Sequence, residues 1–365
     1  MQGKLLVDAE NFMARLEEDI LHARGTVMVQ AMTFEGDNAG KRLIEAMISS
    51  QAKERFLLID SYTKAVINDH FVIGPEYLRS SSFREEVKKT KQIIQEGLKS
   101  GIQIKFTNPL GFLGYKYPLR NHKKMISIDG MVSYIGGINF SDHNFAWHDA
   151  MIRVEDNRLS QVIEEDFRMT LSGMNQSRKV ELAEGALYFL NGSRSKSLYE
   201  DLFSHLSEAR KTIDIISPYV SDPLLSHLKN KVGRRVQIRI ISPRENNKSI
   251  FKKYLNNELQ KGYFELLHYQ KGMSHLKAIL IDGETLIMGS SNFDFVSYHF
   301  EQEVVLVSKD KTMLREFEEK VLNVDLSLSK RVTPDGLSSS KSVGVLVDVL
   351  HKVSYWAGTS FLKPK

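Results

Sequence analysis

The residues with the clearest capacity for chemistry are two histidines, each followed two positions later by a lysine. His122 and Lys124 form the first pair, and His275 and Lys277 form the second. Residues i and i+2 of a strand point to the same face, so the imidazole and the ammonium of each pair are expected to project together. One such tripeptide is common by chance, whereas two in matching surroundings indicate a duplicated site.

The surroundings of the two pairs repeat. The segment RNHKKMISIDGMVSYIGGINF recurs loosely as MSHLKAILIDGETLIMGSSNF, which gives the pattern H-x-K-x4-D followed by G-[GS]-x-N. Matching residues share one offset of 153 positions, without a gap: His122, Lys124, Asp129, Gly136 and Asn139 correspond to His275, Lys277, Asp282, Gly289 and Asn292.

These groups suit chemistry at a phosphodiester. Lysine and asparagine side chains donate to non-bridging oxygens, while one imidazole attacks phosphorus and the other protonates the leaving oxygen. The lysines neutralise phosphate charge, so the sequence predicts a reaction without metal and without a cofactor. The predicted phosphate-binding residues are Lys124, Asn139, Lys277 and Asn292.

Carboxylates are expected to orient the two imidazoles, as in catalytic triads generally. Asp149 stands 27 residues after His122, and Glu303 stands 28 residues after His275. Glu301 is the rival of Glu303. Asp129 and Asp282 complete the catalytic motif in a supporting role, because each ends a strand at an Asp-Gly turn and can hold turn backbone or the lysine.

The elements that position these residues alternate between short apolar runs and helical periodicity, which predicts α/β architecture. We expect two similar halves, each a mixed β-sheet flanked by helices, packed about a pseudo-twofold axis with the active site between them. Expected helices include 39–50 and 85–98. Expected strands are 27–32, 56–59, 102–106, 125–128 and 133–135 in the first half, and 212–216, 236–241, 264–267, 278–281 and 285–288 in the second.

Composition bounds the organisation of the chain. It has 365 residues, 42% of them hydrophobic, and no cysteine, which excludes disulfides, thiolate metal sites and a cysteine nucleophile. The predicted boundaries are 1–174 for the first half, 175–325 for the second, and 326–365 for a Ser-rich linker with a basic amphipathic tail. The net charge is +5, and most of it lies in that tail. A nearly neutral body argues against a broad nucleic-acid surface.

Two segments indicate what the protein could bind. Phe112, Tyr115 and Tyr117 lie in a loop that leads to His122, and they form either a packed surface loop or a lipid-contacting rim. In the tail, an apolar helical face (Leu346, Val349, Leu350, Val353 and Trp356) predicts either a helix docked on the second half or a membrane anchor. The tail's charge favours an anionic membrane surface.

The chain resembles the phospholipase D superfamily, whose signature is a duplicated HKD motif. The GGIN segment with Trp147-His148-Asp149 is most similar to bacterial cardiolipin synthases, although His148 stands where that branch has Arg, and Val296-Ser297 stands where it has Arg-Ser. The resemblance implies a covalent phosphohistidine mechanism. His122 attacks phosphorus, and His275 serves first as the general acid and then as the base.

Three functions follow as hypotheses. The first is a phosphatidyltransferase of cardiolipin synthase type acting on phospholipid, the second is a phospholipase D that hydrolyses head groups, and the third is a phosphodiesterase nuclease. A catalytically dead binding module is disfavoured because both motifs are intact. The expected location is cytoplasmic, peripheral at the inner face of the cell membrane, because neither a secretory signal nor a long apolar run is found. The sequence does not decide between transfer and hydrolysis, and it leaves the oligomeric state open.

Overall fold

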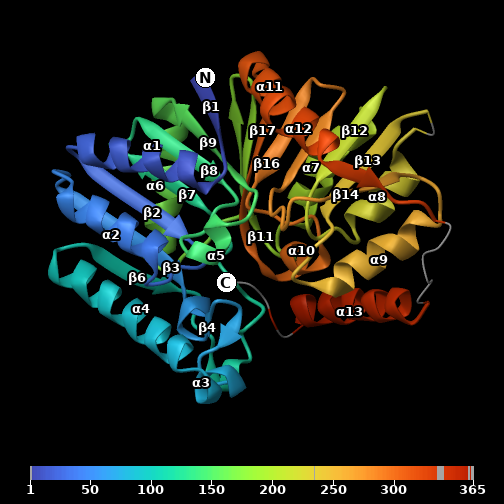
Figure 1. Cartoon of the computed structure of the whole chain (residues 1–365). Helices are drawn as coiled ribbons and strands as arrows, with labels where there is room; N and C mark the ends of the chain where they lie inside the picture. The colour runs from blue at the N-terminus through green and yellow to red at the C-terminus, as the bar shows by residue number, and fades with distance from the viewer. Residues whose placement is uncertain (1, 234, 335–340, 361, 363–365) are drawn as a thin grey trace. The chain divides into compact units, whose positions relative to one another are not determined.

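The computed structural model describes residues 2–233, 235–334, 341–360 and 362, which fall into two compact units (Figure 1). The first unit holds residues 6–176 together with Gln2. The second holds the described residues from Ser177 onward together with Gly3–Leu5. The observed boundary follows residue 176, where the sequence placed it after residue 174.

The first unit is built on a seven-stranded mixed sheet in the order β1-β9-β8-β7-β2-β3-β6. β2 pairs in parallel with β3 and β3 with β6, whereas β7, β8 and β9 continue the sheet in antiparallel pairs. The strands are β1 (Gln2–Val7), β2 (Thr26–Ala31), β3 (Glu54–Asp60), β6 (Gln103–Thr107), β7 (Met125–Ile128), β8 (Val132–Gly136) and β9 (Ala150–Glu155).

Helices cover both faces of this sheet, because its strands are apolar on both sides. Leu57 of β3 belongs to the core shared with α1 (Ala9–His22) and α2 (Asn38–Ser49). The next residue along the strand toward the N-terminus, Phe56, points the other way and meets Phe167 of α6 (Asn157–Leu171) edge to face. α4 (Ser81–Lys99) packs beside α2 and against β6. A single turn, α5 (Asp142–Phe145), precedes β9.

The second unit has a nine-stranded mixed sheet in the order β10-β11-β17-β16-β15-β12-β13-β14-β18. The strands are β10 (Arg178–Leu182), β11 (Gly185–Asn191), β12 (Thr212–Ile216), β13 (Gln237–Pro243), β14 (Glu265–Tyr269), β15 (Ala278–Ile281), β16 (Thr285–Gly289), β17 (Gln302–Ser308) and β18 (Ser329–Arg331). Its helices include α7 (Lys196–Ser207), α8 (Leu224–Lys231), α9 (Ser249–Leu259), α10 (Phe295–Phe300), α11 (Lys311–Phe317), α12 (Asn323–Ser327) and α13 (Lys341–Ser360).

The two sheets share one strand order, which confirms the predicted fold class of two similar α/β halves. The series β9-β8-β7-β2-β3-β6 corresponds to β17-β16-β15-β12-β13-β14. Next to β9, β1 leads through α1 into β2. Next to β17, β11 leads through α7 into β12 in the same way. The second unit adds β10 and β18 at its edges.

Two segments differ from the expected organisation. Between Asp60 and α4 the first half has a segment without a counterpart among the described residues of the second: a 3₁₀ turn, η1 (Ser61–Lys64), a hairpin of β4 (Val66–Ile67) and β5 (His70–Phe71), and α3 (Pro75–Arg79). Part of the predicted linker is β18, which pairs with β14 as an edge strand. The Ser-rich residues 335–340 lie outside the described residues.

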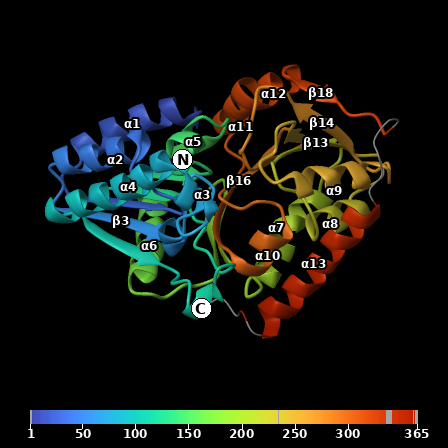
Figure 2. The same ribbon diagram turned by 60° about the horizontal axis from the view of Figure 1, so that its bottom comes forward.

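The C-terminal helix α13 packs on the second unit, with α9 and α10 as its neighbours (Figure 2). The His351 ring lies 5.1 Å from that of His299 on α10, and Ser193 Oγ donates to the carbonyl of Gly358 at 3.0 Å. Among its described side chains, Val347 and Ser354 are buried, whereas Leu346, Val349, Val353 and Trp356 are 48–58% exposed. The helix docks through residues 347, 351, 354 and 358, which follow helical spacing on a different face from the predicted apolar one.

Throughout the described ranges, the search for a bilayer-spanning helix finds none of sufficient length and apolar character.

Candidate active site

Each histidine motif leads into a hairpin whose turn holds the motif aspartate. Asp129 and Asp282 both have φ of 54°, and the glycine after each also has positive φ. Successive residues with positive φ form the tight turn that Asp-Gly sequences favour in hairpins. Asp129 accepts from the backbone N–H groups of residues 24, 25 and 26, and Asp282 accepts from those of residues 210, 211 and 212. Each carboxylate therefore ties its turn to the start of the neighbouring central strand.

This placement corrects the inclusion of Asp129 and Asp282 among the catalytic residues. β7 and β15 separate each aspartate from its histidine, so the carboxylates lie at the far end of the strand, about 3.3 Å per residue away. The sequence left open whether they hold turn backbone or the lysine. Both carboxylates accept from backbone N–H groups at the start of the neighbouring central strand. We assign both aspartates a structural role.

The histidines and lysines lie where the central strands end. β7 runs antiparallel to β2, so His122 lies at the carboxyl end of β2; β15 and β12 place His275 in the same way. All four side chains are buried. Lys124 donates to the carbonyl of His122 at 2.8 Å, whereas Lys277 donates both to the carbonyl of His275 and, at 2.7 Å, to its Nδ1. An ammonium can only donate, so Nδ1 of His275 is the acceptor in this pair.

The two asparagines are buried beside the motif strands but differ in their bonds. Asn139 Oδ1 accepts from the backbone N–H of Thr33 at 3.2 Å, and its Nδ2 donates to Asn144 at 3.3 Å. Asn292 is buried, and its Oδ1 has no hydrogen-bond partner among the described residues. An amide with an unsatisfied buried oxygen is costly unless a ligand or water supplies a donor.

Sheet register identifies the carboxylate of the second half that matches Asp149. Gly136 pairs with Met151, and Gly289 pairs with Val305. Asp149 lies two residues before the first partner and Glu303 two residues before the second, so the two carboxylates occupy equivalent positions. The extra residue in the second half lies in the connection between the paired strands. The register therefore favours Glu303 over Glu301 as the counterpart of Asp149.

The sequence differences next to these carboxylates match their lengths. A Cβ at Gly137 would lie only 2.4 Å from an oxygen of Asp149, so this position has no room for a side chain. The equivalent residue, Ser290, instead donates from its Oγ to Glu303 at 2.5 Å. Asp149 and Glu303 are both buried, and Asp149 Oδ1 accepts from the N–H of Ala150 at 2.8 Å.

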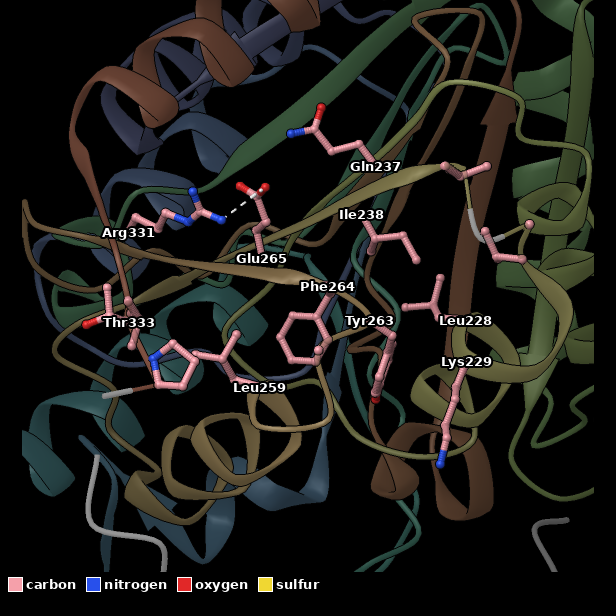
Figure 3. Close-up of a pocket in the computed structure, with 16 residues that line it drawn as sticks. Leu228, Lys229, Gln237, Ile238, Leu259, Tyr263, Phe264, Glu265, Arg331 and Thr333 are labelled. Atoms are coloured by element: carbon pink, nitrogen blue, oxygen red, sulfur yellow. Dashed lines mark ion pairs between the residues drawn. The ribbon is translucent and has the colours of Figure 1, made fainter. Parts of the chain in front are cut away.

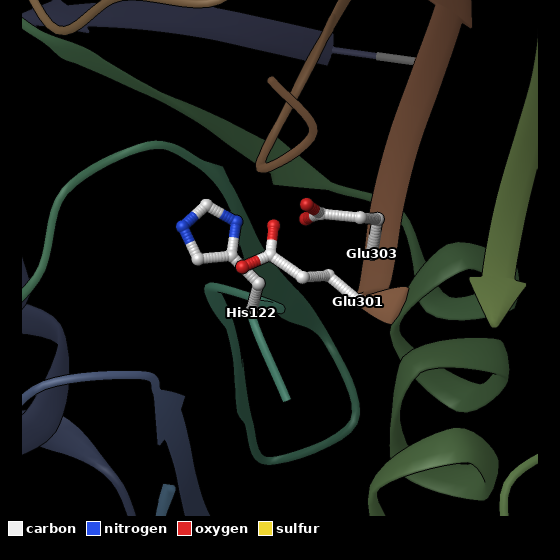
Figure 4. Close-up of side chains that lie close together, drawn as sticks. All are labelled: His122, Glu301 and Glu303. Carbon is white, nitrogen blue, oxygen red and sulfur yellow. The ribbon is translucent and has the colours of Figure 1, made fainter. Parts of the chain in front are cut away.

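A second buried carboxylate, Glu301, lies beside Glu303. Figure 4 shows the side chains of Glu301 and Glu303 leaving the start of β17 in the same direction. The hydroxyl of Ser297 lies 2.8 Å from an oxygen of each, and its single proton can be donated to only one of the two at a time. Ser297 is the residue that this chain retains from the expected Arg-Ser pair, and the structure gives it a positioning role.

Sequence reasoning missed Asp294, which caps α10 and accepts from the N–H groups of Val296 and Ser297. Burial raises the pKa of Asp294 to about 7, and the charge of Glu301 adds to the rise. The GSSNFD segment contained the signal, because an aspartate before a helical turn is a typical N-cap.

Asp60, also missed, fixes the segment that carries His122. Its carboxylate accepts from the Arg120 guanidinium at 2.5 Å, from the N–H of Asn121 at 2.6 Å and from the N–H of Tyr62 at 2.7 Å. Asp60 and Arg120 are both buried. A buried bidentate or multiply bonded ion pair rigidifies its surroundings, since breaking it leaves an uncompensated charge. The residues just before His122 are therefore tied to the end of β3.

The loop before His122 exposes its apolar side chains. Phe112 is 81% exposed, Leu113 90% and Tyr115 55%. Tyr117 is partly covered by Tyr62 and Phe71, whose ring centroids each lie 5.8 Å from its own. These three side chains are therefore not packed against the protein, as the alternative of a packed surface loop requires, and their exposure is compatible with a lipid-facing rim.

His148, which stands where the cardiolipin synthase branch has Arg, lies on the first unit beside Asp8. Its Nδ1 is 2.7 Å from Asp8 Oδ1, and the N–H of Asp8 also donates to the carbonyl of Asp149 at 2.8 Å. The replacement thus forms part of the link between the end of β1 and the segment that leads to Asp149.

A pocket of about 880 Å³ in the second unit lies away from its histidine (Figure 3). Its lining includes Gln237 and Ile238 at the start of β13 and Glu265 at the start of β14, which pairs with Arg331 at 3.3 Å. His275 lies near the opposite end of these parallel strands. The pocket is therefore not part of the histidine site.

Comparison with known families gives one match that covers most of the chain. The family described as "Cardiolipin synthase, PLD-like domain" matches residues 16–171 and 202–324. The probable cardiolipin synthase YwiE of Bacillus subtilis (strain 168) is 26% identical, with 91% of this chain and 67% of that protein covered. Cardiolipin synthase of Listeria welshimeri is 24% identical, with 91% and 70% covered. The chain thus spans about two thirds of the length of these relatives.

Solved structures support the fold. A phosphatidylserine synthase from Haemophilus influenzae Rd KW20 matches with a TM-score of 0.71 and 12% identity, over 98% of this chain and 94% of that one. A polyphosphate kinase from Porphyromonas gingivalis matches with a TM-score of 0.62 and 11% identity, over 96% of this chain and 53% of the kinase.

Proposed function

This chain belongs to the cardiolipin synthase family with a PLD-like domain and is an enzyme of the phospholipase D superfamily; from that premise we propose that it transfers phosphatidyl groups between alcohols through a phosphohistidine. One observation carries the proposal. Both halves keep an intact His-x-Lys at the end of equivalent central strands, and the register supplies each half with an equivalent buried carboxylate.

The proposed reaction has two displacements at one phosphorus atom. His122 attacks the phosphorus of a phospholipid, the bond to the head-group oxygen breaks, and that oxygen takes a proton from the His275 imidazolium. In the second displacement an acceptor hydroxyl gives its proton to His275 and attacks phosphorus, and the P–N bond to His122 breaks. The lysines and asparagines stabilise the charge on the non-bridging oxygens. That His122 and His275 meet at one phosphorus stays a prediction.

Asp149 and Glu303 act as positioning residues in this proposal. A buried carboxylate beside an imidazole holds its tautomer and stabilises the cation that forms when it is protonated or phosphorylated. The equivalent positions of Asp149 and Glu303 support one such partner for each histidine. The proposed reaction assigns no step to a metal.

An anionic membrane surface is the proposed partner, reached from the cytoplasmic side. The exposed face of α13 presents Leu346, Val349, Val353 and Trp356, and Lys352 is exposed on the same helix. Helices with an apolar face and basic residues bind in the plane of a membrane interface. Phe112, Tyr115 and Tyr117 supply a second apolar element, the proposed lipid rim. Nucleic acid is not the proposed substrate.

Product analysis on vesicles tests the proposal. The protein is incubated with vesicles of phosphatidylglycerol and phosphatidylethanolamine, and the lipids are identified by mass spectrometry, with His122→Asn as the control. Cardiolipin together with the released head-group alcohol is the expected result. Phosphatidate as the sole product would replace transfer with hydrolysis. DNA is offered in a parallel incubation. Cleavage of the DNA together with unchanged lipids would replace both hypotheses with the nuclease hypothesis.

A further inference from the structure

A second cavity lies wholly within the first unit, on one side of the segment between β3 and α4 that the second half lacks. It has a volume of about 530 Å³ and lies between η1, the β4–β5 hairpin, α3 and α4. Cavities of this size accommodate small molecules. In the second unit, the connection from β13 to β14 contains α9 and no counterpart of the hairpin. The cavity therefore exists because this added segment packs against α4 and β6, which do have counterparts in the second unit.

The wall of this cavity is apolar. It consists mainly of aliphatic and aromatic side chains: Ile67, Val72, Ile73, Tyr77, Val87, Ile94 and Phe106. Two buried threonines also line it, but their hydroxyls are bound to backbone. Thr63 Oγ1 accepts from the N–H of Phe34 and donates to Met32, and Thr90 Oγ1 accepts from the N–H of Gly36 and donates to Glu86. The threonines thus add little polarity to the wall.

The charged groups of the cavity are both positive. Lys64 places its Nζ 3.8 Å from the centroid of the Phe106 ring, which holds the ammonium over an apolar wall. Lys91 lies on α4, one turn after Val87, and is exposed at the rim. None of the described residues that line the cavity is acidic. An alkyl chain with an anionic head complements this combination of an apolar wall and two ammonium groups.

We propose that this cavity binds one alkyl chain of an anionic amphiphile, with the carboxylate or phosphate head at Lys64 and Lys91. The exposed side chains of Phe71 and Ile73, on and after the hairpin, provide an apolar entrance from a lipid phase. The inference goes beyond the proposed function, because binding here requires no turnover and uses none of the motif residues.

Asp60 connects the cavity to the segment before His122. Asp60 caps η1, which carries Thr63 and Lys64, and the same carboxylate accepts from Arg120 and the N–H of Asn121. His122 follows directly. A ligand in the cavity would therefore contact the turn whose cap is the same buried carboxylate that fixes the approach to His122.

Isothermal titration calorimetry tests the proposal. It measures the binding of dodecyl phosphate to the full chain, below the critical micelle concentration. The double variant Lys64→Glu/Lys91→Glu is compared with Lys88→Glu/Lys89→Glu, which makes the same charge change on exposed residues of α4 outside the cavity. We expect the first variant to bind about tenfold or more weakly and the control to bind as the unaltered protein. Equal affinity in the two variants would overturn the proposal, as would binding of dodecanol with the affinity of dodecyl phosphate.

A filling variant keeps the result independent of charge. Val72→Trp inserts a large side chain at a half-buried wall position, and Leu78→Trp is its control on exposed α3. Loss of binding in the first alone, with unchanged thermal midpoints, supports the site. Retained binding in Val72→Trp contradicts it.

Two further measurements distinguish whether the bound alkyl chain belongs to the substrate or to a second amphiphile. If the cavity holds a chain of the substrate, dodecyl phosphate competes with phosphatidylglycerol in mixed micelles, and Lys64→Glu/Lys91→Glu raises the KM. If it holds a second amphiphile, dodecyl phosphate changes kcat without competition. Either result presupposes the binding already measured. Binding without any lipid turnover would reject the proposed function and leave the site standing.

Discussion

Among single residues, the two carboxylates nearest the motif strands differ in what holds them. Asp149 sits against Gly137 in a space that admits no Cβ, whereas Glu303 is one methylene longer and accepts from Ser290 and Ser297. Glu301 shares the Ser297 hydroxyl but starts two residues earlier, outside the register that matches Asp149. A positioning role therefore falls to Glu303, with Glu301 as its neighbour.

Replacement of Glu303 by Gln is expected to lower kcat about a hundredfold or more, because the amide cannot stabilise an imidazolium as the carboxylate does. Glu301→Gln is the matched control, since it makes the same change on the same Ser297 contact. We expect a loss of less than about tenfold for this control, and a pH profile altered only in Glu303→Gln. Initial rates on mixed micelles across pH measure both. Equal losses would remove the distinction that the register makes.

Replacement of His275 is expected to leave the first displacement slow but detectable and to stall the second. His275→Asn should lower turnover by about 10²–10⁴-fold and allow a phosphatidyl adduct on His122 to accumulate. Intact-protein mass spectrometry with a short-chain phospholipid measures the adduct. His122→Asn should show no adduct under the same conditions. An adduct on both variants, or on neither, would contradict the assigned nucleophile.

At the scale of elements, each motif strand is anchored at its Asp-Gly turn. Its Asp-Gly turn is tied to backbone of the adjacent central strand, and its other end carries the histidine and lysine. In the first unit, Asp60 and Arg120 add a buried ion pair just before His122. The first hairpin is therefore anchored at both ends, and the second is anchored at its turn.

Asp129→Ala should destabilise the first unit. It removes a carboxylate that accepts three backbone N–H groups and places alanine at a positive φ. We expect the thermal midpoint to fall by about 5 °C or more, with little change in kcat per folded molecule. Glu284→Ala, an exposed turn residue of the other hairpin, is the control. A large fall in kcat with an unchanged thermal midpoint would show that Asp129 has a catalytic role after all.

The raised pKa of Asp294 should make the stability of the second unit depend on pH. Its folded pKa of about 7 exceeds the ordinary value of 3.8, so the folded state binds more protons between these values. Its contribution to stability is therefore full below about pH 4 and is lost as pH rises toward 7. Asp294→Asn keeps the cap and removes the titration. Relative to wild type, its thermal midpoint should rise between pH 4 and pH 8, and a pH-independent difference would contradict the assignment.

For the whole molecule, the relevant features are the exposed apolar surfaces that its two units leave uncovered. α13 docks through Val347, His351 and Ser354 and leaves a stripe of large apolar side chains in solvent. The loop before His122 does the same with Phe112 and Leu113. Such contiguous apolar surface is typical of interaction sites with a membrane or another molecule.

Val349→Glu/Val353→Glu should weaken binding to anionic vesicles by about tenfold or more, because it places two negative charges on the α13 stripe. Leu21→Glu/Leu98→Glu is the matched control. The side chains of these leucines are 46% and 50% exposed, and those of the two valines are 48% and 52% exposed. Vesicle co-sedimentation at low and high salt measures binding. Turnover of a small soluble phosphodiester should not change. Identical vesicle binding by the two variants would remove α13 from the membrane contact.

The sequence by itself determined the duplicated motif, its strands and its chemistry. β7, β12 and β15 have the predicted bounds, because these short buried strands are mostly apolar and stand out from the polar residues around them. The His-x-Lys spacing and the Asp-Gly turns are local, so they needed no knowledge of what lies far away in the chain. The family resemblance rested on the same residues.

Only the tertiary structure decided the matters that depend on distant partners. The choice of Glu303 over Glu301 came from the pairing of β16 with β17, and the structural role of Asp129 came from backbone more than a hundred residues away. The docking face of α13 also escaped the sequence, because an apolar stripe shows that a helix is amphipathic but not which surface it meets. Long-range hydrogen bonds and burial are properties of the folded chain, and a pattern of nearby residues does not contain them.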